Sequence, residues 1–65
     1  MKIEPDRLIW VSEMESLDIE IMPDGLSILV GHEMQGSVNI LFATHEVRAL
    51  AEALLRFADT GRMDP

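Results

Sequence analysis

The chain has 65 residues, which excludes a second independent core, since a domain of this size buries only about 60% of the surface that its unfolded chain exposes. It has no cysteine, which excludes disulfide bonds and thiolate metal sites. A formal charge of −7 argues against direct binding to nucleic acid or to an anionic membrane surface.

Hydrophobic residues make up 48% of the chain, so a core is feasible, but it has to be small. Self-association is therefore expected. The N-terminus has no apolar run behind a basic flank, and no stretch approaches the roughly 18 apolar residues of a spanning helix. These features predict a soluble, cytoplasmic protein that forms one domain over residues 1–65.

The first predicted element is a strand over residues 7–14. Ile9, Trp10 and Val11 favour a strand, whereas Pro5-Asp6 could equally start a helix, and that alternative stays open. Trp10 is expected to be a partly buried aromatic residue of this strand, with a role as an interface anchor as the alternative.

A hairpin is predicted next, with strands over residues 17–22 and 26–31. Leu17 to Ile21 alternates strictly between aliphatic and acidic residues, as expected for a half-buried strand. Pro23-Asp24-Gly25 combines a fixed φ, a side chain that hydrogen-bonds locally and a residue tolerant of positive φ, which predicts a tight turn.

A further strand is predicted over residues 37–43, and a helix over residues 45–59 that Thr44 caps. Apolar residues recur in the helix at spacings of three and four, and Gly61 is placed to end it. The tail, residues 60–65, is expected to be loose. The apolar stripe of the helix comprises Val47, Leu50, Ala51, Leu54, Phe57 and Ala58.

Together these elements predict an α+β fold, an antiparallel β-meander of three to four strands with one C-terminal amphipathic helix packed on one face. The core is expected to form where the helix covers the sheet. The predicted core residues are Leu17, Ile19, Ile21, Leu26, Ile28, Val30, Val38, Ile40 and Phe42 of the strands, with Leu50, Leu54 and Phe57 of the helix.

The negative charge is concentrated in the first half of the chain. Residues 1–36 carry eight acidic residues against Lys2 and Arg7, a net six negative charges, whereas residues 37–65 carry a net one. Carboxylates two residues apart on a strand stand about 6.7 Å apart on one side, a spacing of the order of that between phosphates. Six acids are therefore the candidate partner-binding site: Glu13, Glu15, Asp18, Glu20, Asp24 and Glu33.

The alternative interpretation of these acids is a solvated face that keeps the protein soluble and discourages edge pairing. Apolar residues also fall on the sheet face that the helix is not expected to cover, or among the acids. Such residues mark either a contact surface for a partner or the interface of a homodimer. They are Met14, Met22, Leu29, Met34 and Leu41.

No motif for catalysis is present. The dipeptides His32-Glu33 and His45-Glu46 lack the spacing of a zinc site, and the serines have no nucleophile motif around them. We expect a protein that is not an enzyme and has no cofactor or metal. A metal-dependent enzyme that uses His32 and His45 is the competing hypothesis from the catalytic class.

The segment Val38 to Asp59, a β-prone run that passes through Thr44 into HEVRALAEALLRFAD, resembles the end of many small bacterial and phage domains of unassigned function. As a class, a 65-residue, cysteine-free acidic chain is similar to the small inhibitors made by phages and mobile elements, such as anti-CRISPR proteins and other DNA mimics. That resemblance implies a basic nucleic-acid-binding partner, such as a CRISPR effector, with a groove lined by Lys and Arg.

The leading hypothesis is thus a non-enzymatic inhibitor that presents phosphate-like carboxylates to a basic partner. The competing hypothesis is a small homodimeric accessory domain whose sheet face and helix hold the subunits together. In that case the acids serve only solubility.

Overall fold

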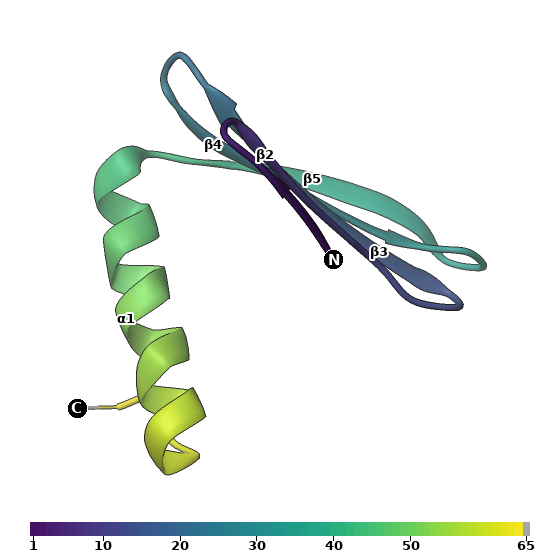
Figure 1. Ribbon diagram of the computed structural model, residues 1–65. Coiled ribbons are helices and arrows are strands. Elements are labelled where there is room, and N and C mark those ends of the chain that lie inside the picture. Colours follow the sequence, from purple (N-terminus) through teal and green to yellow (C-terminus); the bar gives the residue numbers. More distant parts are fainter. Residues whose placement is uncertain (65) are drawn as a thin grey trace.

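The computed structural model describes residues 1–64, which form one antiparallel sheet followed by one helix (Figure 1). The strands are hydrogen-bonded in chain order, so the sheet is a β-meander. The elements are β1 (Lys2–Glu4), β2 (Arg7–Val11), β3 (Glu15–Met22), β4 (Gly25–His32), β5 (Gly36–Phe42) and α1 (Thr44–Thr60).

The α+β fold with a C-terminal helix is confirmed, but the expected three to four strands are wrong, because the sheet has five. The additional strand is β1, which pairs with β2 through a two-residue turn formed by Pro5-Asp6. The turn between β3 and β4 is formed by the same dipeptide, Pro23-Asp24. This repeated turn chemistry explains why so short a segment as β1 folds back onto its neighbour.

Residues 7–14 contain a strand and no helix, and the strand ends at Val11. The chain then turns at Ser12, whose backbone N–H donates to the Glu15 carbonyl oxygen at 2.8 Å. The Ser12 hydroxyl accepts a hydrogen bond from the Glu15 N–H at 3.2 Å. These bonds close the loop, so β3 begins at Glu15, two residues before the predicted start.

Gly25 is required by a close approach of β5 rather than by a positive φ. Among residues 1–64, the glycines with positive φ are Gly36 and Gly61. A Cβ atom on Gly25 would lie only 2.1 Å from the carbonyl oxygen of Phe42. The end of β5 therefore lies close against the start of β4, where Phe42 pairs with Leu26.

The strand register aligns apolar residues in three rows across the sheet. One row runs through all five strands, and the other two run through four and three strands. We call this surface the apolar sheet face. Its rows are Ile3, Leu8, Ile19, Ile28 and Ile40; Trp10, Leu17, Val30 and Val38; and Ile21, Leu26 and Phe42.

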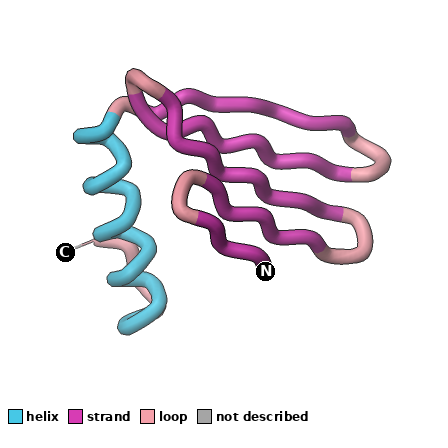
Figure 2. Tube along the Cα trace, turned by 45° about the horizontal axis from the view of Figure 1, so that its top comes forward, coloured by secondary structure: helices cyan, strands magenta, loops and turns pink. Residues whose placement is uncertain are grey.

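The helix does not pack on the sheet, so the predicted core is wrong. α1 leaves the sheet at one end and extends away from it, as the views in Figures 1 and 2 both show. No residue among 1–64 is buried. The physical reason lies in the connection, because the single residue Ala43 joins β5 to α1, whereas connections between strands and helices that pack on one another usually take two to six residues.

The start of α1 differs from the predicted cap at Thr44. The N-cap is Ala43, which is extended with φ −67° and ψ 154°, and Thr44 is the first helical residue. Since Ala43 has no polar side chain, the reciprocal bond comes from Glu46, whose carboxylate accepts the Ala43 N–H at 2.9 Å. Glu46 also places a negative charge in the first turn, where it is favourable.

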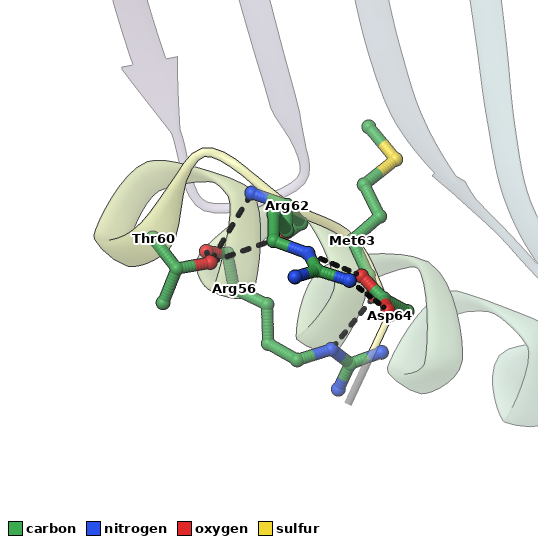
Figure 3. Close-up of polar contacts among 5 residues, drawn as sticks. All are labelled: Arg56, Thr60, Arg62, Met63 and Asp64. Atoms are coloured by element: carbon green, nitrogen blue, oxygen red, sulfur yellow. Dashed lines mark hydrogen bonds and ion pairs between the residues drawn. The ribbon is translucent and has the colours of Figure 1, made fainter.

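Residues 61–64, for which the sequence predicts a loose tail, make hydrogen bonds at the end of α1 (Figure 3). Gly61 adopts φ 78°, and its N–H donates to the Phe57 carbonyl oxygen at 2.8 Å. The Arg56 Nε–H donates to the Met63 carbonyl oxygen at 2.8 Å, which folds the chain back along the helix. Pro65 lies outside the described residues.

Candidate functional site

The apolar sheet face is left uncovered in the structure. Val38 and Ile40 on β5 remain 63% and 49% exposed, although both lie in apolar rows. Trp10, which is expected to be partly buried, is 39% exposed on the same face. In soluble proteins, contiguous groups of exposed apolar side chains mark sites of interaction with other molecules.

The dimensions of the molecule also show that it exposes more surface than a closed domain. Its accessible surface is 5367 Å², whereas a folded monomer of 7.3 kDa exposes about 4,200 Å². Its radius of gyration is 13.1 Å, against about 10.7 Å for a compact domain of 65 residues. The chain therefore exposes about 1,200 Å² more than a closed domain of its mass.

The helix presents a second uncovered apolar surface. Leu54 and Phe57 are 51% and 53% exposed. α1 approaches the sheet along one side, where Val47 and Leu55 line a groove of about 530 Å³ together with Leu26 of the apolar sheet face. The helix thus stands at the end of the sheet on its apolar side, and an open angle separates the two elements (Figure 1).

The opposite face of the sheet carries polar groups in fixed pairs. The Asn39 side-chain amide donates to the Ser27 hydroxyl at 2.8 Å, across β4 and β5. Leu29 and Leu41 lie on this face, as the alternation of their strands predicts. The two faces therefore differ in chemistry, and two neighbouring residues of one strand lie on opposite faces.

Three of the six candidate acids gather at one end of the sheet. Glu13 lies in the loop between β2 and β3, Glu15 begins β3, and Glu33 follows β4. All three line one shallow hollow, and the Glu33 N–H donates to the Met14 carbonyl oxygen at 2.8 Å, which joins the two loops. This end of the molecule carries unpaired negative charge among the described residues, since no ion pair there involves these acids.

Asp18 is neutralised by Arg7 on the polar face. The Arg7 guanidinium donates two hydrogen bonds to the Asp18 carboxylate, from Nε at 3.0 Å and from Nη2 at 2.5 Å. These hydrogen bonds, with the positive charge of Arg7, hold the pKa of Asp18 below its usual value. The same contact raises the pKa of Arg7. A carboxylate engaged in this way is not free to imitate a phosphate.

The six acids do not form the continuous surface that the sequence predicts. Glu20 lies beside Asp18 on the polar face, directly opposite Arg7. Glu15 lies on the other face of β3, because it is three residues from Asp18 and successive side chains of a strand alternate between the faces. Asp24 lies in the turn at the far end of the sheet. The strand bend at residues 12–14 breaks the alternation on which the expectation rested, and a role of these acids in binding a partner stays a prediction.

The two histidines are not brought together. His32 ends β4 and pairs with Gly36 at the start of β5, whereas His45 lies in the first turn of α1, beyond the other end of β5. His32 is instead part of the β4–β5 turn, where its Nδ1 accepts the N–H groups of Met34 and Gln35 at 3.1 and 3.2 Å. Within residues 1–64, no group of three His, Asp or Glu side chains could hold a metal ion. The hypothesis of a metal site shared by the two histidines is therefore wrong.

The residues that sequence reasoning missed are those that extend the apolar sheet face onto β1 and β2. Ile3 and Leu8 pair with each other, and Leu8 pairs with Ile19 in the central row. The signal that could have found them is the Pro5-Asp6 dipeptide, which places Ile3 opposite Leu8. No helix of the described segment is long and apolar enough to cross a membrane.

Comparison of the chain with models of known protein families, with curated protein sequences and with solved structures gave no match.

Proposed function

We propose that the protein is a homodimeric interaction module, in which two copies cover each other's apolar surfaces. The observation that carries this proposal is the absence of any buried residue among 1–64 in a chain with 48% hydrophobic residues. A second copy supplies the apolar contacts that a core requires, and a symmetric dimer is the commonest assembly that does so.

The size of the uncovered surface supports a dimer. An excess of about 1,200 Å² per copy corresponds to about 2,400 Å² in total, which lies in the range of obligate homodimers. A smaller surface, of about 800 Å² per partner, is typical of a standard interface between separately stable proteins. The protein therefore folds and associates in one step, and its lone copy is not a stable species.

The test is the mass of the purified protein in solution. Light scattering at micromolar concentration should give twice the 7.3 kDa of the chain. The melting temperature should also rise with protein concentration, because association stabilises only the folded state. A mass of one chain, together with a melting temperature that does not depend on concentration, would contradict the proposal.

A second candidate function is supported by the unpaired acids at one end of the sheet. Glu13, Glu15 and Glu33 could contact a basic groove of a nucleic-acid-binding protein, in the manner of the DNA mimics that the chain resembles as a class. In a dimer this end is repeated, so the assembly would present two acidic contacts. The support is narrower than for the dimer, because three acids carry it rather than six.

Competition with labelled duplex DNA for purified CRISPR effector complexes tests this candidate. The protein should displace DNA at low salt and lose this ability as salt rises. The substitution Glu33→Lys should weaken the competition, whereas Asp59→Lys near the end of α1, which changes the net charge by the same amount, should leave it nearly unchanged. Equal effects of the two changes would point to net charge alone and remove the acidic site.

A further inference from the structure

We infer that α1 of each copy packs along the apolar sheet face of the other copy, in a reciprocal exchange of helices. This inference rests on the proposed homodimer and adds which surfaces meet. The two surfaces are the rows of the apolar sheet face and the apolar stripe of the helix. Both are uncovered in a single copy, and each can supply the apolar contacts that the other does not have.

The short connection between β5 and α1 keeps most of the helix away from its own sheet. β5 ends at Phe42 and α1 begins at Thr44, so Ala43 alone would have to reverse the chain direction. The hydrogen bond that the Ala43 N–H donates to the Glu46 carboxylate fixes this junction further. A helix that starts in this way has to find its apolar contacts on another molecule.

The lengths of the two surfaces match. The 17 residues of α1 span about 26 Å at 1.5 Å per residue. The eight-residue strands β3 and β4, at the centre of the sheet, span about 26 Å at 3.3 Å per residue. A helix therefore fits along the central strands of a second copy, with Leu54 and Phe57 over the row that contains Ile28.

The position of the helix disfavours the simpler stacking of one sheet on another. α1 stands on the apolar side of its sheet, as the groove between Val47 and Leu26 shows. A second sheet laid flat on this face would meet the helix, whereas a second helix enters the open angle between α1 and the sheet (Figures 1 and 2). Each copy contributes two surfaces, so the excess area corresponds to about 600 Å² for each of them.

Nuclear Overhauser effects in a mixed dimer test this arrangement with the unaltered sequence. Equal amounts of ¹³C-labelled and unlabelled protein are mixed through unfolding and refolding, and contacts between the two copies are selected by isotope filtering. Contacts should join the side chains of Leu54 or Phe57 to Ile19, Ile28 or Ile40. Contacts between two sheet faces, without any from the helix, would overturn the exchange.

Crosslinking gives an independent measurement, since the chain has no cysteine of its own. The variants Ile40→Cys and Leu54→Cys, one of them tagged so that the products differ in mass, are mixed and treated with a short bismaleimide. The mixed product should exceed both products of identical variants. The matched control replaces Ile40→Cys by Leu41→Cys, which lies on the opposite face and is 51% exposed, and the mixed product should then be lost.

The possible outcomes separate the two proposals. A protein of monomeric mass that gives no contacts between copies overturns both the dimer and the exchange. A dimer in which Ile40→Cys crosslinks mainly with itself overturns only the exchange, because the sheets then meet face to face or edge to edge. Circular dichroism of each variant verifies that the substitutions leave the fold intact.

Discussion

Ile40 and Leu41 are neighbours on β5 that report on opposite faces of the sheet, and substituting each by alanine separates a covered face from an open one. The two side chains are 49% and 51% exposed in a single copy, so they start from matched environments. If the chain acted as a monomer, Ile40→Ala and Leu41→Ala would lower the free energy of unfolding by similar, small amounts. If the apolar sheet face is covered in a dimer, only Ile40→Ala weakens the association.

The expected magnitude follows from the half of Ile40 that remains to be buried. Complete burial of an isoleucine side chain stabilises by about 1.5–3 kcal/mol, so covering the exposed half contributes about 1 kcal/mol per copy. A symmetric dimer contains the residue twice. The loss of about 2 kcal/mol raises the dimer dissociation constant about 30-fold, while Leu41→Ala changes it by less than about threefold.

Sedimentation equilibrium or light scattering over a dilution series gives the dissociation constants of the wild type and of both variants. Circular dichroism at high protein concentration verifies that each variant keeps its strands and helix. Equal dissociation constants for the two variants would refute the assignment of the apolar sheet face as the dimer interface. A larger effect of Leu41→Ala would mean that the opposite face is the one that is covered.

Three further substitutions test local features of the structure, each by urea unfolding at a fixed protein concentration. Asp18→Asn should lower the free energy of unfolding at neutral pH. The difference from the wild type should vanish as the pH falls through the lowered pKa of Asp18, since the pair with Arg7 contributes only while this carboxyl is ionised. A difference that grows in acid would contradict the pairing. Gly25→Ala should destabilise the protein by about 1–3 kcal/mol, because its Cβ would meet backbone atoms of Phe42 that cannot move aside. Gly31→Ala should destabilise it less, because its Cβ would meet only the rotatable Ser16 hydroxyl. His32→Ala should cost about 1 kcal/mol through the loss of its two backbone hydrogen bonds, and ¹⁵N spectra of the wild type should show the ring proton on Nε2.

The alternation of residues was sufficient to predict most of the sheet. Leu17 to Ile21 assigned the apolar and polar sides of β3 correctly, because a strand places successive side chains on opposite faces. The pattern failed at β1, where three residues with a single aliphatic side chain give too little signal. Only the turn chemistry of Pro5-Asp6, repeated at Pro23-Asp24, indicates that this segment turns back.

The candidate site was harder to predict, because a pattern identifies an apolar surface but not what covers it. The sequence located the stripe of α1 and the rows of the sheet, and the expectation that they cover each other within one chain was wrong. Whether the helix covers its own sheet depends on the single residue Ala43, which sets the direction of the helix. For the acids, spacing alone could not show that Arg7 lies within reach of Asp18, because 11 residues separate them along the chain.

The response to salt separates the two proposed functions, because it has opposite signs for them. Each copy carries a net charge of −7, so two copies repel each other, and screening by salt reduces that repulsion while leaving apolar burial intact. The dimer should therefore tighten between low and moderate salt. Contact of Glu13 and Glu33 with a basic partner should weaken over the same range, because screening there reduces an attraction. A dimer that dissociates as salt rises would mean that ion pairs hold the copies together, which would contradict an interface built from the apolar sheet face and α1.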